Sequence, residues 1–280
     1  MREVMTEEIV KNVKEMCIEA NHFLAPDMKR TLECALQKEK SPLGKQILEN
    51  LEENLKIAGE DMIPICQDTG MAVVFVKIGQ EVHISGGSLN DAINEGVRQG
   101  YEEGYLRKSV VGDPLLRVNT KDNTPAIIHY DIVPGDQLEI TVAPKGFGSE
   151  NMSRLFMLKP ADGVEGVKNA ILTAVRDAGP SACPPMVVGV GIGGTFERAA
   201  YLAKKALTRN VEERSELPHI KELEEEMLEK VNHLGIGPAG LGGTVTALAV
   251  NIETFATHIA GLPVAINLCC HVNRHAHRVL

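Results

Sequence analysis

Residues 63–76 read Ile-Pro-Ile-Cys-Gln-Asp-Thr-Gly-Met-Ala-Val-Val-Phe-Val, and the character of the chain changes within this stretch. Met71–Val76 is a short, continuous apolar run, which predicts a buried strand. Directly before it, Cys66 stands in a loop of proline, glycine and polar residues. We therefore expect a helical lead to end near residue 60 and a body of mixed structure to begin here.

The sequence pattern of this helical lead predicts helices over about residues 6–59. Ser41-Pro42 combines a capping residue with a proline at the first helical position, which is a typical helix start. Gly59 is the expected stop. The helix after Pro42 should bury one apolar stripe, formed by Leu43, Ile47, Leu48, Leu51 and Leu55.

The body mixes helices and strands. Ser88, with Asp91 three residues later, predicts a helix that runs to about Arg107. Apolar alternation on both sides of Pro134-Gly135-Asp136 predicts a β-hairpin over residues 126–142. Further along we expect helices over 164–177, 196–207, 220–233 and 244–258, and strands over 186–190 and 264–268. Since no regular β-α-β order appears, the pattern favours an α+β fold, and we expect one domain over residues 1–280.

The composition excludes several classes of protein. A formal net charge of -9 over 280 residues argues against nucleic-acid binding. The apolar runs are shorter than the ~20 residues that a membrane span needs, and the polar N-terminus does not resemble a signal peptide. We therefore expect a cytoplasmic protein in which the 6 cysteines stay reduced, and in which any cysteine with a special role serves ligation or catalysis rather than a disulfide.

Three cysteines lie in unusual peptides, with glycine, proline or polar residues beside the thiol. Cys66 precedes Gln67-Asp68-Thr69-Gly70, Cys183 precedes Pro184-Pro185, and Cys270 ends the run Asn267–Cys270 before a histidine. Three thiolates from distant loops can hold an iron–sulfur cluster and leave one iron without a protein ligand. An open iron is a Lewis acid, so the pattern favours catalysis over electron transfer.

Glycine-rich loops form a second group of motifs. Gly189–Gly194 fits the G-x-G-x-x-G nucleotide pattern, but no second strand with an acidic end follows the next helix, which argues against a dinucleotide site. Gly191–Thr195 recurs as Gly240–Thr244, and both loops are expected to lead into helices. Each either aims backbone N–H groups at an anion or allows close backbone packing. Lys145–Asn151 is a third such loop, or a tight turn.

Several of these motifs together resemble the class I, iron–sulfur-dependent fumarate hydratases and the related L-tartrate dehydratases. The resemblance runs from about residue 5 to the end and is to the α part, a separate subunit in the two-chain enzymes. The motifs that carry it are Cys66–Gly70, Lys145–Asn151, Cys183–Pro185, Gly191–Thr195 and Thr257–Pro263.

The resemblance implies a [4Fe–4S] cluster held by Cys66, Cys183 and Cys270. Cys269 is the alternative third ligand, but the family cysteine precedes a histidine or aromatic residue, as Cys270 precedes His271. The resemblance also implies that the enzyme reversibly hydrates fumarate, a small dicarboxylate, to L-malate. It further implies a separate β subunit in an oligomer such as α2β2. Without the β subunit, the chain is expected to carry the cluster but to be nearly inactive.

The resemblance also implies roles at the substrate. Gln67 and Asp68 match residues that face it, and His258 matches a histidine near a substrate carboxylate. Asp68 and His258 are the expected catalytic residues, with Asp68 orienting the hydroxyl or moving its proton. Whether the base that removes the carbon-bound proton lies here or in the β subunit stays open. Further substrate contacts are expected from Arg107, Gly146 and Gly148, with Phe147 in place of a glycine that many members carry.

Other interpretations remain open from the sequence. The chain is alternatively an L-tartrate dehydratase α subunit. The substrates of the two enzymes differ by one hydroxyl group, and the sequence of the α part does not reveal which substrate is bound. Cys269 and Cys270, with His271, His275 and His277, are also typical zinc ligands, so a non-catalytic zinc- or cluster-binding protein is the alternative of another class. Cys17 and Cys34 lie on helical stretches and are expected to be packing residues.

Overall fold

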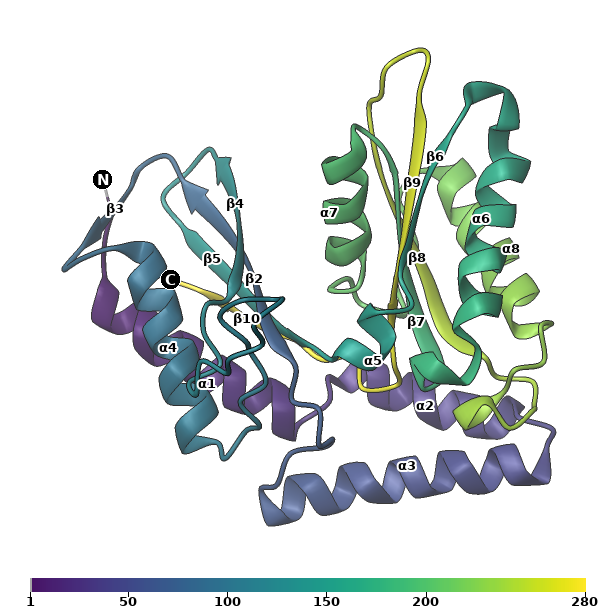
Figure 1. Cartoon of the computed structure of the whole chain (residues 1–280), viewed down its shortest axis with the longest axis horizontal. Helices are drawn as coiled ribbons and strands as arrows, with labels where there is room; N and C mark the ends of the chain where they lie inside the picture. Colours follow the sequence, from purple (N-terminus) through teal and green to yellow (C-terminus); the bar gives the residue numbers. More distant parts are fainter. Residues whose placement is uncertain (1) are drawn as a thin grey trace. The chain divides into compact units, whose positions relative to one another are not determined.

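The computed structural model describes residues 2–280 and forms two compact units (Figure 1). Unit 1 comprises residues 2–25, 55–147 and 274–280, and unit 2 comprises residues 26–54 and 148–273. Both contain helices packed on a sheet, which confirms the α+β class. The helical lead contributes α1 (Thr6–His22) to unit 1 and α2 (Pro26–Lys38) to unit 2, and α3 (Pro42–Asp61) spans the division at residue 54.

The sheet of unit 1 has the order β10-β5-β2-β4. Its strands are β2 (Met71–Gly79), β4 (Ile127–Val133), β5 (Leu138–Lys145) and β10 (Ala276–Val279). The predicted hairpin over 126–142 is wrong, because β2 lies between its two strands, parallel to β4 and antiparallel to β5. The apolar β2 has the more buried side chains and takes the central place, whereas β4 exposes alternate residues.

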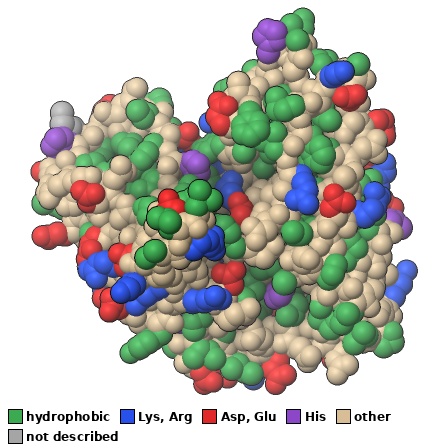
Figure 2. All heavy atoms as spheres, viewed as in Figure 1, with side chains coloured by type: hydrophobic (Ala, Val, Ile, Leu, Met, Phe, Trp, Pro, Cys, Tyr) green, Lys and Arg blue, Asp and Glu red, His purple; other side chains and the backbone are tan. Residues whose placement is uncertain are grey.

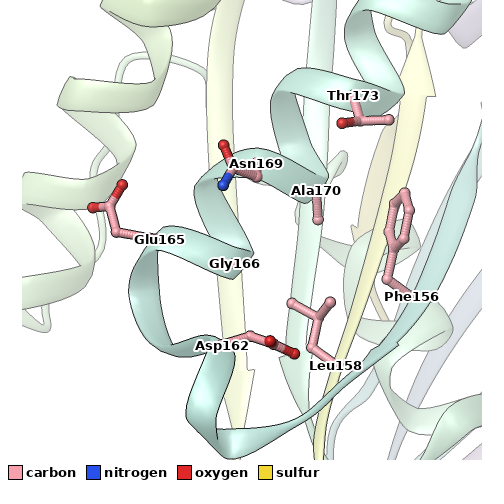
Figure 3. A pocket seen from close by; sticks show the side chains of 8 residues that line it. All are labelled: Phe156, Leu158, Asp162, Glu165, Gly166, Asn169, Ala170 and Thr173. Atoms are coloured by element: carbon pink, nitrogen blue, oxygen red, sulfur yellow. The ribbon is translucent and has the colours of Figure 1, made fainter.

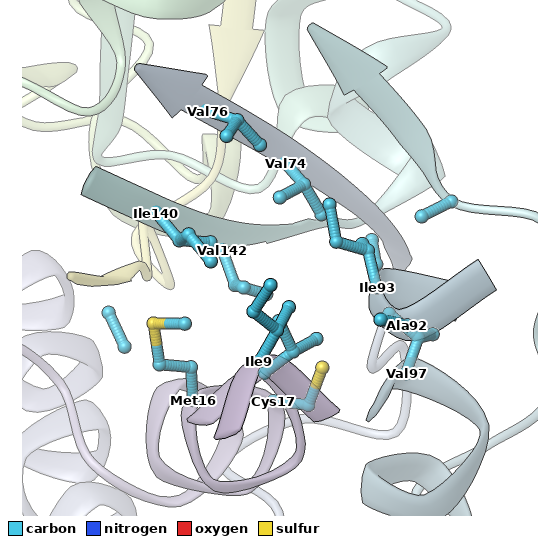
Figure 4. Packing of buried hydrophobic residues seen from close by; sticks show 14 of the residues in the cluster. Ile9, Met16, Cys17, Val74, Val76, Ala92, Ile93, Val97, Ile140 and Val142 are labelled. Carbon is cyan, nitrogen blue, oxygen red and sulfur yellow. The ribbon is translucent and has the colours of Figure 1, made fainter. Parts of the chain in front are cut away.

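Helix α1 and α4 (Leu89–Glu103) cover one face of this sheet and enclose its core (Figure 4). Ile9 and Met16 of α1 meet Val74 of β2 and Val142 of β5 in that core, and all four are buried. The two helices approach closely where a Cβ atom at Gly96 would lie 2.8 Å from the Val10 carbonyl oxygen. β1 (Arg2–Met5) pairs with β3 (Val82–Ser85) beside them.

Helix boundaries follow the local signals with small differences. Ser88 caps α4 by accepting a hydrogen bond from the Asp91 N–H at 3.3 Å, as predicted, but the helix ends at Glu103. Ser41 Oγ likewise accepts from the Gly44 N–H at 3.2 Å at the start of α3, and that helix continues past Gly59 to Asp61.

The sheet of unit 2 has the order β6-β9-β7-β8. Its strands are β6 (Arg154–Leu158), β7 (Met186–Gly193), β8 (Ala247–Phe255) and β9 (Leu262–Cys269). The predicted helix over 244–258 is wrong, because Ala247–Phe255 runs as a strand parallel to β7. Val250 and Ile252, both β-branched and buried, favour this pleated, enclosed position.

The helices of unit 2 cover both faces of this sheet (Figure 1). α6 (Gly163–Ala178) and α8 (Pro218–Asn232) pack over Val188 and Val190 of β7, and the short α5 (Phe147–Glu150) precedes β6. α7 (Phe196–Ala206) packs on the other face. The predicted helices over 164–177, 196–207 and 220–233 are thus confirmed, as are the strands over 186–190 and 264–268.

The glycine pattern at residues 189–194 is explained by this packing. Gly189 and Gly191 lie within β7, where added Cβ atoms would stand 2.3 Å from the Ala203 carbonyl oxygen and 2.1 Å from that of Ala199. Both carbonyls belong to α7, so only glycine lets the helix pack this close to the strand. The pattern therefore serves helix-on-strand packing at these two positions.

The surface is mixed in charge. On the face shown in Figure 2, Lys and Arg side chains are interspersed with Asp and Glu side chains. Within residues 2–280, no helix combines the length and the apolar character that a membrane span requires.

Candidate active site

Residues 66–70, here called the Cys66 turn, lead directly into β2 in unit 1. The Cys66 thiol is half-buried, and its Sγ accepts a hydrogen bond from the Asp68 N–H at 3.4 Å. The same thiol donates to Gln67 Oε1 at 3.3 Å. The turn therefore gathers the predicted ligand Cys66 and the predicted substrate residues Gln67 and Asp68 on one short peptide.

The Asp68 carboxylate is held by two backbone N–H groups. Its Oδ1 accepts from Gly70 at 3.1 Å and its Oδ2 from Phe147 at 2.9 Å. A Cβ atom at Gly146 would lie 3.1 Å from Asp68 Oδ2, so this predicted residue lies against the carboxylate. A carboxylate that accepts backbone hydrogen bonds is fixed in direction, as a group that orients a substrate must be.

Arg107 lies next to the same turn. Its backbone carbonyl accepts a hydrogen bond from Thr69 Oγ1 at 3.0 Å, and its side chain is exposed. The structure thus brings together Cys66, Gln67, Asp68, Arg107 and Gly146 within unit 1.

Cys183 and Cys270 belong to unit 2, and strand pairing brings their peptides together. Cys183 precedes the start of β7, and Cys270 follows the end of β9, which is antiparallel to β7. The carbonyl oxygen of Cys183 accepts hydrogen bonds from His271, from the backbone N–H at 3.4 Å and from Nδ1 at 3.2 Å. Gly148 lies near this loop, since its Cβ would be 3.7 Å from the Ser181 carbonyl oxygen.

The cysteines differ in their surroundings. Cys183 is exposed and Cys270 half-buried, whereas Cys269 is buried in the sheet opposite Val187. Burial raises the pKa of the Cys17 thiol to about 12, which keeps it protonated and confirms it as a packing residue. Cys34 is exposed, so the same prediction is wrong for that residue.

The donor set fits an iron–sulfur cluster in its chemistry. Cys66, Cys183 and Cys270 are at least partly exposed, and cysteine thiolates are the usual ligands of iron–sulfur clusters. Within either unit, as far as residues 2–280 describe it, no three His, Cys, Asp or Glu side chains gather as metal ligands. The geometry therefore gives no support to zinc bound by Cys269, Cys270 and His271 within unit 2.

His258 lies at the other end of the unit 2 sheet. It follows β8, whose last residue pairs with Gly193 at the end of β7, whereas Cys183 precedes the first residue of β7. The eight residues of β7 span roughly 23 Å, so His258 and the Cys183 loop are separated by about that distance. Its Nδ1 accepts from the Ala260 N–H at 3.1 Å, and the residue is exposed.

Two pockets of unit 2 are lined by described residues that include no cysteine. His258 and His219 border an apolar pocket of about 460 Å3 between α6, α8 and the loop after β8. A second pocket, of about 430 Å3, lies between α6 and β6 and is lined by Asp162, Asn169 and Phe156 among others (Figure 3). None of the described side chains that line the second pocket was predicted as a site residue.

The second glycine loop, Gly240–Thr244, binds an anion that belongs to the chain itself. The buried carboxylate of Glu39 accepts hydrogen bonds from the backbone N–H groups of Thr244 and Val245, at distances of 2.9 to 3.0 Å. It also accepts from Lys40 and Ser41 at the start of α3, each at 2.8 Å. The loop leads into β8, so the predicted helix after it is wrong. A Cβ atom at Gly243 would lie 2.8 Å from Glu39 Oε2, so close packing explains this glycine, and binding of an external anion stays a prediction.

The sequence analysis did not identify the buried residues that donate hydrogen bonds to the backbone of the Cys66 turn. Tyr101, Asn123 and Arg274 are buried and donate hydrogen bonds to its backbone carbonyls. They come from three distant segments, and no local pattern marks them. Only the Asn-x-Pro peptide at Asn123 carries a turn signal.

Comparisons with known proteins agree with this site. The model of the fumarate hydratase (Fumerase) family matches residues 10–279. A protein of Methanocaldococcus jannaschii, provisionally named L(+)-tartrate dehydratase subunit alpha, is 48% identical over 270 residues, which cover 94% of each chain. The L(+)-tartrate dehydratase subunit alpha of Escherichia coli strain K12 is 35% identical over 240 residues, covering 84% of this chain and 78% of the relative.

The fold, the cysteine peptides at strand ends and these relatives define a hydro-lyase α subunit. The chain belongs to the fumarate hydratase family, which is identified here across nearly the whole length of the sequence.

Proposed function

We propose that this chain is the cluster-bearing α subunit of an iron–sulfur hydro-lyase that acts with a separate β subunit. The observation that carries the proposal is the contact between His271 and the Cys183 carbonyl, which places the Cys183 and Cys270 peptides side by side. Cys66 is the third ligand in this proposal. The relatives named as subunit alpha support the β partner. The two compact units then act as one hydro-lyase domain over residues 1–280.

The reaction removes water from a 2-hydroxydicarboxylate, or adds it to the alkene. In the dehydration direction the carbon–oxygen bond to the hydroxyl breaks, the neighbouring carbon loses a proton, and an alkene and water leave. When bound, the cluster supplies a Lewis-acidic iron for the hydroxyl group. Asp68 orients that hydroxyl or delivers the proton with which it leaves as water, because the Gly70 and Phe147 N–H groups hold its carboxylate in one direction.

Other residues of unit 1 bind the substrate in this proposal. Gln67 contributes a polar side chain beside the Cys66 thiol. Arg107 supplies a guanidinium for a substrate carboxylate, since its side chain is exposed where its backbone meets the Cys66 turn. Gly146, which lies against the Asp68 carboxylate, and Gly148 of unit 2 contribute backbone groups to the substrate in this proposal.

His258 requires a second copy of the chain. At roughly 23 Å from the Cys183 loop, its imidazole does not reach a group held by Cys183 and Cys270 of the same chain. We therefore assign it to a substrate carboxylate in the site of a neighbouring chain. Cysteines that serve as cluster ligands rather than in disulfides fit a reducing cytoplasm.

Fumarate–malate and tartrate chemistry are both consistent with the relatives, and L-malate dehydration to fumarate is our first choice. The test is co-expression with the β subunit under anaerobic conditions, followed by assays of L-malate and L-tartrate dehydration. Higher kcat/KM on L-malate supports fumarate hydratase. Higher kcat/KM on L-tartrate establishes the tartrate alternative, and inactivity on both contradicts the proposed reaction.

A further inference from the structure

The Cys66 turn directs three successive carbonyl oxygens toward buried donors. The carbonyl of Asp68 accepts from Arg274, that of Thr69 from Tyr101 Oη at 2.7 Å, and that of Gly70 from Asn123 Nδ2 at 3.1 Å. Tyr101 and Asn123 are fully buried. With these carbonyls fixed from behind, the thiol of Cys66 and the carboxylate of Asp68 have one defined orientation.

Strand register brings Arg274 to this position. Ala276 at the start of β10 pairs with Val142 of β5, and Pro144 of β5 pairs with Ala72 of β2. Arg274 lies two residues before Ala276 and therefore extends along β5 toward the point where the Cys66 turn enters β2. A long-range pairing thus positions a residue that is close to Cys270 in the sequence.

Arg274 differs from the other two donors because it is charged. Arg274 is only 4% exposed, and its guanidinium donates to the Asp68 carbonyl oxygen rather than to a carboxylate. Among the described residues, its buried Nε has no hydrogen-bond partner. A buried charge that is not paired with a carboxylate is unfavourable, so the positive charge at this position requires an explanation beyond folding.

We propose that Arg274 is a positioning residue for the hydro-lyase site. Its guanidinium fixes the peptide between Asp68 and Thr69, and its charge offsets the negative charge that thiolate ligands bring to the site. The charge role rests on the proposed function, because it requires a bound cluster. The positioning role concerns the cluster-free chain and does not depend on that function.

The experiment compares Arg274→Met, Arg274→Lys and the uncharged control Tyr101→Phe. Thermal melts first establish that each variant folds, and the uncharged Arg274→Gln replaces Arg274→Met if the latter does not. Amide hydrogen exchange of residues 67–70 is then measured in the cluster-free chain. Loss of the Arg274 hydrogen bond should accelerate exchange in this turn at least tenfold, while exchange in β7 stays unchanged.

The reduction potential of the reconstituted cluster is the second readout. Removal of the positive charge should lower the potential in Arg274→Met, whereas Arg274→Lys and Tyr101→Phe should stay near the wild-type value. Unchanged exchange in residues 67–70 overturns the positioning role. A potential that shifts equally in Tyr101→Phe and Arg274→Met overturns the charge role. If the wild-type chain binds no cluster, the proposed function fails while the exchange measurement still decides the positioning role.

Discussion

His271 donates two hydrogen bonds to the carbonyl oxygen of Cys183, from its backbone N–H at 3.4 Å and from Nδ1 at 3.2 Å. The ring nitrogen and the main chain together hold the peptide after Cys270 against the loop of Cys183. This contact comes from the antiparallel pairing of β7 and β9 and organises two of the three proposed ligands before any cluster binds.

The substitution His271→Ala removes the ring contact and should weaken cluster retention. We expect the half-life of cluster-bound iron, followed during chelator challenge, to shorten several-fold while the melting temperature changes little. His233→Ala, which changes an exposed histidine at the end of α8, is the control. An unchanged iron half-life in His271→Ala contradicts a role for this contact.

Asp68→Asn keeps the size of the side chain but removes its negative charge. We expect kcat to fall on the order of 10²–10⁴-fold, the usual range for loss of an acid–base group, with iron content unchanged. Asp136→Asn, at an exposed turn, should leave kcat intact. A normal kcat in Asp68→Asn would show that the proton moves through another group.

The role of His258 in a neighbouring chain predicts complementation between inactive variants. His258→Ala and Cys66→Ser are each expected to be inactive with the β subunit. When two differently tagged chains are co-expressed, mixed dimers contain one intact cluster site that receives His258 from the other chain. With random pairing, about half of the dimers are mixed and each has one of its two sites intact. Activity should then recover to about a quarter of wild type. Absence of recovery in purified mixed dimers would place His258 outside the neighbouring site.

Glu39 predicts an acid-sensitive stability. Burial alone would raise the pKa of this carboxyl group, but the N–H groups of Ser41, Thr244 and Val245 lower it below the ordinary value. The stabilisation is therefore fully present above the ordinary pKa of 4.5 and is lost as the pH falls through the lowered folded pKa.

Glu39→Gln should lower the free energy of unfolding by about 1–3 kcal/mol at neutral pH, because buried N–H donors lose an acceptor. The difference from wild type should shrink in acid, as measured by denaturant unfolding at several pH values. Glu49→Gln, on the exposed part of α3, is the control. A constant difference across pH would contradict the carboxylate's role.

Local signals predicted much of the fold, and the errors came from long-range pairing. The Ser88 cap and the apolar run at Met71–Val76 identified α4 and β2, because each depends on neighbours in sequence. The alternation around Pro134 correctly indicated two strands, but nothing local shows that β2 inserts between them. The segment before His258 became a strand because its β-branched residues are enclosed between β7 and α8.

The residues of the candidate site also divide into those with a local sequence signal and those placed by long-range contacts. Cys66 and Asp68 stand in a distinctive peptide, so their side chains were predictable. Arg274 and Tyr101 act on that peptide from more than 30 residues away, and an arginine or tyrosine alone carries no sign of such a partner. Glu39 follows the last residue of α2 in an ordinary sequence, and the glycine loop that binds it was predicted either to face an anion or to allow close backbone packing.

Iron and sulfide content after anaerobic reconstitution, with dehydratase activity measured in the presence and absence of the β subunit, tests the central claim most directly. The account predicts about four irons and four sulfides per chain, lost in Cys66→Ser, Cys183→Ser and Cys270→Ser but retained in Cys34→Ser, with activity only when β is present. Iron that persists after all three substitutions, or full activity of the chain alone, would contradict it.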